Sequence, residues 1–259
     1  MTNLLRQALA HPLTRGLDID SPATTALRRR IVREKSFLRK LYEEWYRLID
    51  AALPRIDGMV LELGSGAGFL DEFVDGLITS EVFPTPGARL VLDGTRLPFP
   101  ASSLRAIVMT DVFHHIAAPR AFLSEAARTL KPGGAIVMIE PWVSAWSRWV
   151  YRHLHHEPFE PDAVNWEFPT TGPLSGANGA LPWIVFSRDR TLFESEFPAL
   201  HVRAIQPMMP VSYLLSGGVS MRSLMPGFMY RPWRILERGV GPLTDYLAMF
   251  AMIIVQARR

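Results

Sequence analysis

The chain has 259 residues, of which 48% are hydrophobic and 20% charged, so it can bury one sizeable core and is not globally disordered. The absence of cysteine excludes disulfides, cysteine-ligated metal sites and a thiol nucleophile. The longest apolar run, Leu247 to Val255, is about half a membrane span, and the first sixteen residues lack the apolar core of a secretory signal. We therefore predict a soluble, cytoplasmic protein without a transmembrane segment.

The basic residues are unevenly placed, although the net charge is only +3. Seven of them lie between Arg28 and Lys40, in a stretch whose apolar residues recur every three or four positions from Leu27 to Leu48. This spacing predicts one amphipathic helix with a solvated basic face. A nucleic-acid-binding surface is the alternative interpretation, and we do not favour it.

Short apolar runs alternate with turns and helices after residue 57. The predicted strands cover 59–64, 77–82, 88–93, 105–111, 135–140, 201–208 and 247–256, and the predicted helices among them cover 69–74 and 119–130. Such alternation indicates an α/β fold with a mostly parallel, doubly wound sheet. Lys131 to Gly134 predicts a sharp turn.

One connection is too short for a helix. Only eight residues separate Glu81 from Leu90, whereas a helical crossover between parallel strands needs at least about ten to twelve. We therefore predict two parallel strands joined without a helix. An antiparallel hairpin from Leu77 to Asp93 would contradict this prediction.

A glycine-rich motif, Glu62-Leu-Gly64-Ser-Gly66-Ala-Gly68, follows the first predicted strand. Glycines at alternate positions let the backbone turn tightly and approach a ligand closely. The dinucleotide fingerprint would need a further glycine where Phe69 stands, which disfavours an NAD-dependent oxidoreductase. A tight turn without a ligand is the plain alternative.

Five motifs in order resemble the class I S-adenosylmethionine-dependent methyltransferases. They are LELGSGAG, the acidic strand end at Glu81, DGTRLPFP from Asp93, TDVFHHI from Thr110, and AARTLKPGG. Within that family the chain is similar to the small-molecule group that includes the ubiquinone and menaquinone C-methyltransferases. The similarity covers Met59 to Glu140, about a third of the chain.

The resemblance implies a single methyltransferase domain with a Rossmann-like, seven-stranded sheet and one antiparallel C-terminal strand. Residues 1–57 would form an N-terminal helical cap and residues 58–140 the S-adenosylmethionine-binding core. Residues 141–259 would hold the acceptor and lid region and the last two strands. The implied product of the donor is S-adenosylhomocysteine, and no metal is expected.

The resemblance also implies a set of cofactor-binding residues. The glycine loop would lie under the methionine moiety, with its carboxylate on backbone donors and Glu62 facing its ammonium. Glu81 would accept hydrogen bonds from the ribose, Asp93 would bind the adenine amine, and Asp111 would line the methionine end. The full set is Glu62, Gly64, Ser65, Gly66, Gly68, Glu81, Val82, Asp93, Gly94 and Asp111. A solvated strand end for Glu81 and a turn former at Asp111 remain alternatives.

His114 and His115 are the candidate catalytic residues, because a histidine pKa lies near neutrality. The alternative is that they only line the pocket, since a sulfonium donor is already activated and orientation can supply much of the rate.

The acceptor is expected to be a small, hydrophobic organic molecule. The segments implied for its pocket are 37–49, 142–156, 157–183 and 210–243, which are rich in aromatic residues and methionine. Ordinary core or lid packing of these residues is the alternative, and for any single residue we favour it. Met208, Met209, Met221, Met225 and Met229 suit a deformable apolar surface for a lipid-like acceptor or for peripheral membrane contact. His153, His155, His156 and Glu157 form a candidate metal group that we do not favour.

Two alternative functions remain: a catalytically inactive S-adenosylmethionine-binding partner protein and an RNA methyltransferase. An RNA methyltransferase would be expected to carry a catalytic tetrapeptide of the type Asn/Asp-Pro-Pro-Tyr. This chain has Thr-Asp-Val-Phe, residues 110–113, in that place, which favours an acceptor other than a nucleobase.

Overall fold

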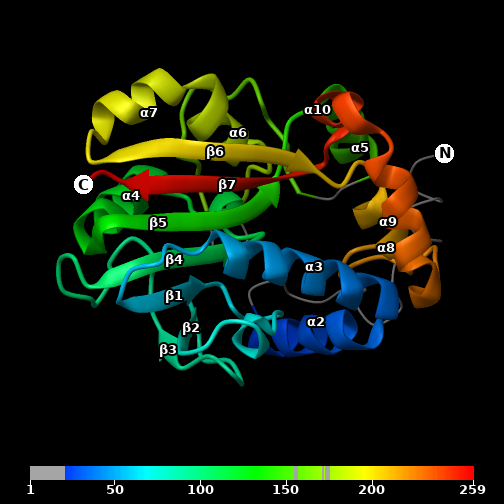
Figure 1. The fold of residues 1–259 in the computed structure, drawn as a ribbon, viewed down its shortest axis with the longest axis horizontal. Coiled ribbons are helices and arrows are strands. Elements are labelled where there is room, and N and C mark those ends of the chain that lie inside the picture. The colour runs from blue at the N-terminus through cyan, green and yellow to red at the C-terminus, as the bar shows by residue number, and fades with distance from the viewer. Residues whose placement is uncertain (1–20, 155–156, 171, 173–175) are drawn as a thin grey trace.

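A mixed sheet of seven strands organises the chain in the computed structural model, which describes residues 21–154, 157–170, 172 and 176–259 (Figure 1). The strand order is β3-β2-β1-β4-β5-β7-β6. The strands are β1 Met59–Leu63, β2 Leu77–Glu81, β3 Leu90–Val91, β4 Leu104–Thr110, β5 Leu130–Pro141, β6 Leu200–Met208 and β7 Phe250–Ala257. Only β7 is antiparallel to its neighbours, which confirms the predicted fold class.

Helices cover both faces of the sheet because the central strands are apolar on both sides. Val60, Val108 and Val137 belong to the core under α3, whereas Leu61, Ile107 and Ile136 belong to the opposite core. The α-helices are α2 Pro22–Glu34, α3 Ser36–Ala52, α4 Pro119–Thr129, α5 Ala145–Leu154, α6 Leu181–Trp183, α7 Arg190–Glu196, α8 Ser212–Ser216, α9 Tyr230–Arg238 and α10 Thr244–Leu247. The 3-10 turns are η2 Leu70–Glu72, η3 Phe113–His115, η5 Gly227–Met229 and η6 Gly241–Leu243, and η4 Ile184–Arg188 is a π-helix.

The helix-free connection after β2 is present. Ser80 pairs with Leu90 and Glu81 pairs with Val91 in parallel register, and no helix is assigned between them. The prediction of two parallel strands with a short connection is therefore confirmed. The carboxyl ends of β2 and β3 consequently lie at the same edge of the sheet as that of β1.

Three predicted elements differ from the structure. The single helix predicted over 27–48 is two helices, α2 and α3, because Lys35 leaves helical geometry with φ −77° and ψ 92°. The helix predicted over 69–74 is the short turn η2. The Lys131–Gly134 turn is a bulge inside β5, since Leu104 pairs with Leu130 and the next pair is Ala106 with Ala135.

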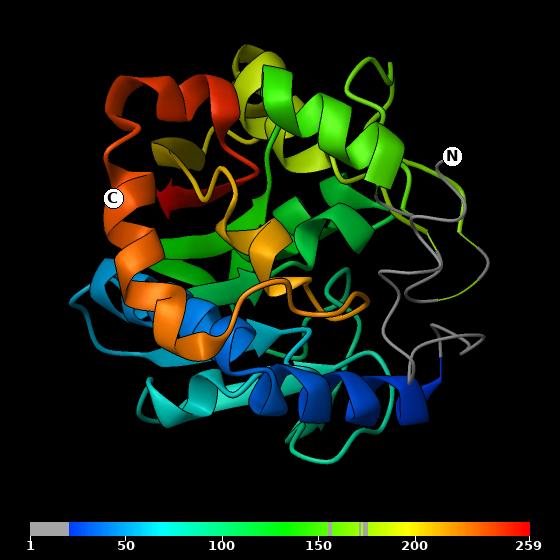
Figure 2. The same cartoon turned by 90° about the vertical axis from the view of Figure 1, so that its right-hand side faces the viewer.

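Several helices surround the edge where the parallel strands end. Figure 2 looks onto this edge and shows α2 in blue, α5 in green and the segment from α8 to α9 in orange around it. Lys35 connects two of these parts, because its Nζ donates hydrogen bonds to the carbonyls of Gly218 (2.5 Å) and Met221 (2.8 Å). The N-terminal helices and the insert between β6 and β7 thus form one cover over the strand ends.

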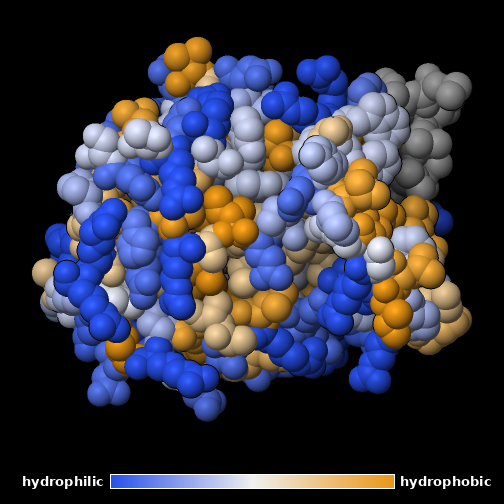
Figure 3. All heavy atoms as spheres, turned by 45° about the horizontal axis from the view of Figure 1, so that its top comes forward, coloured by the Kyte–Doolittle hydropathy of each residue, from blue (hydrophilic) through white to orange (hydrophobic). Residues whose placement is uncertain are grey.

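Helix α9 has an unusual orientation, with polar residues inward. Arg234 pairs with Glu44 of α3 at 2.7 Å, and Glu237 accepts hydrogen bonds from the backbone of Val211 and Ser212. Ile235 and Leu236 are 73% and 69% exposed. Figure 3 shows hydrophobic side chains gathered at the right-hand edge, where Figure 1 places α9. Within the described residues, no helix is both long and apolar enough to cross a membrane.

Candidate active site

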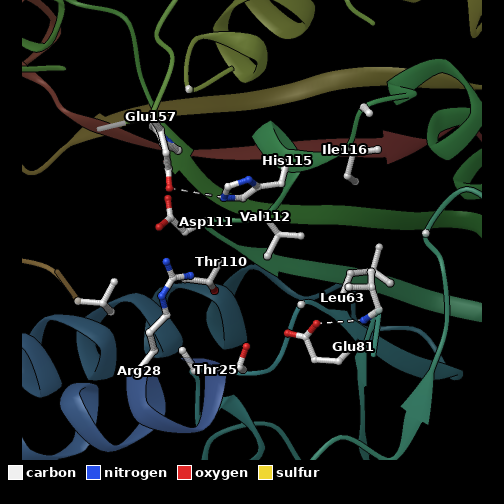
Figure 4. A pocket seen from close by; sticks show the side chains of 18 of the residues that line it. Thr25, Arg28, Leu63, Glu81, Thr110, Asp111, Val112, His115, Ile116 and Glu157 are labelled. Atoms are coloured by element: carbon white, nitrogen blue, oxygen red, sulfur yellow. Dashed lines mark hydrogen bonds and ion pairs between the residues drawn. The ribbon is translucent and has the colours of Figure 1, made fainter. Parts of the chain in front are cut away.

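A cavity of about 550 Å³ opens at the carboxyl ends of the parallel strands, the usual ligand position in open α/β sheets (Figure 4). One part of its wall comes from the strand ends and the other from the segments that cover them. The strand ends contribute Gly64, Glu81, Val82, Asp93, Gly94, Thr110 and Asp111. The covering segments contribute Thr25, Arg28, Tyr42, Tyr151, Glu157, Phe159, Tyr213 and Val219, among others.

The glycine loop is held by its own hydrogen bonds. Gly64 has φ +67°, a conformation that favours glycine, and a β-carbon there would lie 2.5 Å from Val112. The backbone N–H of Ser65 donates to the Ser80 carbonyl at 3.0 Å, that of Gly66 to Glu81 Oε1 at 2.9 Å, and that of Gly68 to the Ser65 carbonyl at 2.9 Å. Three of the loop's donors are therefore already used within the protein.

Four of the predicted cofactor-binding residues do not line the cavity in the described structure: Glu62, Ser65, Gly66 and Gly68. Gly66 is required by packing, because a β-carbon there would lie 2.3 Å from Thr25 Cγ2 and 2.5 Å from Glu81 Oε1. Glu62 is 3% exposed, and burial raises the pKa of its carboxyl to about 8. These residues shape the loop rather than form the cavity surface.

Glu81 and Asp93 present carboxylates at the ends of β2 and β3. Glu81 is buried, and burial raises its pKa despite the hydrogen bonds that it accepts from the backbone of Val82 and Gly66. Asp93 Oδ1 accepts a hydrogen bond from the Thr95 N–H at 2.8 Å, and the neighbouring Gly94 also lines the cavity. Each carboxylate keeps acceptor capacity for a ligand that carries hydroxyl or amine donors.

The end of β4 holds a strained residue beside an unsatisfied hydroxyl. Asp111 has φ +63°, rare for a residue with a side chain, and burial raises its pKa to about 7. The Thr110 hydroxyl is buried and has no hydrogen-bond partner among the described residues. Both residues line the cavity. An unsatisfied polar atom in this wall fits a polar ligand group, as the methionine end of S-adenosylmethionine would supply.

His114 lies behind the cavity wall and is 1% exposed. Its Nδ1 is 2.8 Å from Glu140 Oε2, and the other oxygen of Glu140 accepts the N–H groups of Val112 and Phe113. Burial lowers the pKa of His114, but the hydrogen bonds to Glu140 and Glu157 outweigh it and hold the pKa well above its ordinary value. His114 therefore carries a proton and fastens the loop after β4 to β5.

His115 is the histidine that reaches the cavity. Its Nδ1 lies 3.0 Å from the Gly176 carbonyl, so Nδ1 carries the hydrogen and Nε2 keeps a free lone pair. Nε2 is 4.0 Å from Glu157 Oε1. Burial and the neighbouring charge of His114 lower the pKa of His115 to about 4, so it is neutral at physiological pH.

Aromatic residues form another part of the cavity wall. Tyr42 of α3, Tyr151 of α5 and Tyr213 of α8 line it together with Phe159 and Phe250. Each of the segments expected at the acceptor pocket thus contributes to the lining. The methionines do not: Met208 and Met209 lie in the core under α3, and none of the five named methionines lines the cavity of the described structure.

Sequence reasoning missed Thr25 and Arg28, which reach the cavity from α2. Both residues lie outside the segment that resembles the family, which begins at residue 59. In addition, the basic stretch that contains Arg28 is predicted from the sequence to be a solvent-exposed helix face. Glu157 entered the sequence interpretation as a metal candidate and here faces His114 and His115. The spacing of apolar residues in this helix does not indicate that Arg28, unlike its basic neighbours, faces the cavity.

Two groups of side chains are close enough to share a cation: His114, His115 and Glu157, and Asp111, His114 and Glu140. In both, His114 Nδ1 already contacts Glu140. His153 instead contacts the Trp149 carbonyl through Nδ1 at 2.7 Å, and His155 and His156 lie outside the described residues.

Comparison with known proteins agrees with this geometry. Residues 61–138 match the family model described as a methyltransferase domain. This part of the chain therefore carries a methyltransferase domain. No curated protein matches the chain.

Solved structures with low identity share the fold of this chain. Geranyl diphosphate C-methyltransferase from Streptomyces coelicolor A3(2), in complex with Mg²⁺, geranyl diphosphate and S-adenosylhomocysteine, matches with a TM-score of 0.52 and 13% identity. That match covers 97% of this chain and 89% of the other. A chain of the Haloferax volcanii complex between the Trm112 methyltransferase activator and a methyltransferase matches with a TM-score of 0.50 and 17% identity, covering 90% and 98% of the two chains.

Proposed function

We propose that this methyltransferase transfers a methyl group from S-adenosylmethionine to a small, hydrophobic organic acceptor. The observation that carries the proposal is the set of residues that line the cavity at the strand ends. Carboxylates of Glu81 and Asp93 stand at adjacent strand ends beside Gly64, and three tyrosines line the same cavity. The first part suits a nucleoside with hydroxyl and amine donors, and the second suits an apolar acceptor.

The donor supplies an electrophilic methyl group on a sulfonium. Glu81 would accept hydrogen bonds from the ribose hydroxyls, and Asp93 with the Gly94 backbone would hold the adenine. The covering segments orient the acceptor and exclude water, which favours an in-line displacement. Tyr151 and Tyr213 stay protonated, because burial raises their pKa values well above the ordinary value. Tyr213 can therefore donate a hydrogen bond to an acceptor without adding charge, whereas the Tyr151 hydroxyl already donates to the Met249 carbonyl at 3.0 Å.

The acid–base role falls to His115 rather than His114. The Nε2 lone pair of neutral His115 can hold a proton released by the acceptor, whereas His114 is already protonated and fixed to Glu140. Its low pKa makes His115 a weak base, so positioning supplies the larger part of the rate. His114 acts as a positioning residue.

Isothermal titration calorimetry with S-adenosylmethionine and S-adenosylhomocysteine tests the proposal. We expect both to bind, and Glu81→Gln to weaken binding about 10- to 100-fold, because a charge-assisted hydrogen bond to the ribose is lost. Glu72→Gln is the matched control, since Glu72 lies outside the cavity in an exposed ion pair with Arg33. No affinity of the wild-type protein for either ligand would overturn the proposal. Cofactor affinity without methyl transfer across broad acceptor panels would favour an inactive, S-adenosylmethionine-binding partner protein.

We also propose peripheral contact with an anionic membrane, from which a hydrophobic acceptor could enter. The insert that supplies Val219 to the cavity exposes the apolar side chains Leu224, Phe228, Ile235, Leu236, Leu243 and Tyr246. Exposed arginines at 222, 231 and 238 lie among them, whereas Asp245 is the exposed acid between 221 and 247. Apolar side chains bordered by arginine are typical of surfaces that bind anionic lipids.

A further inference from the structure

Arg28 places a guanidinium in the cavity that has no partner among the described residues. It is the only lysine or arginine among the described residues that line the cavity. Its guanidinium makes no hydrogen bond or ion pair with any described residue, although it is partly buried. Figure 4 shows it reaching from α2 toward Thr110 and Asp111. A partly buried guanidinium with five donors favours a planar anion that can bind them two at a time.

No other described residue of the cavity wall can replace Arg28 in this role. The other charged groups in the lining are the carboxylates of Glu81, Asp93, Asp111 and Glu157. The glycine loop was the expected source of donors for a carboxylate. However, the N–H groups of Ser65, Gly66 and Gly68 donate to acceptors within the protein. An anion that enters the cavity therefore finds its charged donor on α2.

Thr110 is a second, independent indication of a ligand at this place. Its buried hydroxyl lacks a partner among the described residues, and it lines the same part of the wall. Figure 4 shows Thr110 between the Arg28 guanidinium and the strand end. Asp111 follows with an acidic group close enough for Arg28 to act on its charge. Two donors beside one acid match a group that carries both a carboxylate and an ammonium.

We propose that Arg28 and Thr110 bind a carboxylate in the cavity and that Asp111 faces an accompanying ammonium. The inference rests on the proposed function and deepens it. The carboxylate has two possible sources, the amino-acid end of the donor or an acidic acceptor. The pairing with Asp111 favours the amino-acid end of the donor, which moves its carboxylate contact from the glycine loop to α2.

Calorimetry with three ligands separates these sources. S-adenosylhomocysteine has the carboxylate and the amine, S-adenosyl-3-thiopropylamine keeps only the amine, and 5′-methylthioadenosine has neither. For a donor carboxylate, we expect Arg28→Gln to weaken S-adenosylhomocysteine about 10- to 100-fold and to leave the other two unchanged. Arg28→Lys should restore part of the affinity, because it keeps the charge and loses the bidentate geometry. Arg30→Gln is the control, since Arg30 is an exposed residue of the same helix that pairs with Glu34.

Decanoate, titrated into protein saturated with S-adenosylhomocysteine, tests the acceptor as the source. Decanoate binding that is lost in Arg28→Gln, with unchanged nucleoside affinities, supports the carboxylate site and assigns it to the acceptor. Unchanged binding of both S-adenosylhomocysteine and decanoate in Arg28→Gln overturns the inference. If 5′-methylthioadenosine and S-adenosylhomocysteine both fail to bind the wild-type protein, the proposed function fails instead, and a retained, Arg28-dependent decanoate affinity would still support the anion site.

Discussion

Glu62 has a carboxyl group that folding removes from water. It is 3% exposed, and burial raises its pKa from 4.5 to about 8. The folded state thus holds this proton more tightly than the unfolded state, so the free energy of unfolding should fall as the pH rises from about 4.5 to about 8. Glu62→Gln removes this titration. We expect the variant to match the wild type at pH 5 and to exceed its free energy of unfolding by about 4 kcal/mol at pH 9.

Urea denaturation at pH 5, 7 and 9 measures this difference. Glu72→Gln is the control, because its side chain is 43% exposed and pairs with Arg33 at the surface. Asp111 has a raised pKa of about 7 and contributes a slope of the same sign, so Glu62→Gln should reduce the pH dependence without abolishing it. Equal pH slopes for Glu62→Gln and the wild type would show that the carboxyl does not titrate in this way.

The residues around Glu62 show what sequence reasoning can reach. The order of motifs led to Gly64, Glu81, Asp93 and Asp111, all of which line the cavity. It could not distinguish residues that touch the cavity from those that support the loop, because Gly66 is fixed by the approach of Thr25, 41 positions earlier in the chain. Contacts between distant segments leave no local pattern in the sequence.

Lys35 joins the two N-terminal helices to the insert after β6. Its ammonium donates to the carbonyls of Gly218 and Met221, and burial lowers its pKa from 10.5 to about 8. Lys35→Met would leave both carbonyls without this donor, and we expect it to lower the free energy of unfolding at pH 7 by about 1–3 kcal/mol. The unfolded state binds the proton more tightly, so the wild type should gain stability between about pH 8 and 10.5, and Lys35→Met should lack this gain.

Guanidinium denaturation from pH 7 to 10.5 checks both effects. Lys131→Met is the control, because Lys131 donates to the Asp57 carbonyl at an exposed position. If Lys35→Met matched the wild type in the free energy of unfolding and in its dependence on pH, Lys35 would not stabilise the contact between the N-terminal helices and the insert.

The same junction explains an error at the scale of elements. The apolar period continues from Leu27 to Leu48, so the sequence predicts one helix, yet Lys35 turns out of it to reach the insert more than 180 residues later. Likewise, the Lys131–Gly134 turn is absorbed into β5 as a bulge, because both flanking segments pair with β4. The spacing of apolar residues therefore predicts where helices and strands lie. It does not predict a break or a bulge within them when contacts with a distant segment cause it.

At the scale of the molecule, the distribution of apolar surface is uneven. The parallel sheet and its two covering layers could be predicted, because strands that are apolar on both faces need helices on both. The outward apolar face of α9 could not, since its polar residues are held inward by Glu44 and by the backbone of Val211 and Ser212. Because α9 packs inward through Tyr230, Arg234 and Glu237, its exposed Ile235 and Leu236 are left for another surface.

Vesicle sedimentation tests the membrane proposed as that surface. We expect the wild-type protein to pellet with phosphatidylglycerol-containing vesicles, to pellet less with phosphatidylcholine alone, and to be released by salt, because Arg231 and Arg238 border Ile235 and Leu236. Ile235→Glu combined with Leu236→Glu should reduce the bound fraction at least about fivefold, since both apolar contacts are lost and two negative charges are added. Val164→Glu, at a position 89% exposed outside the insert, is the control.

Equal sedimentation of all three proteins would refute membrane contact through α9. A wild type that stays in the supernatant, and whose mass in solution doubles unless both glutamates are present, would assign the surface to a second copy of the chain.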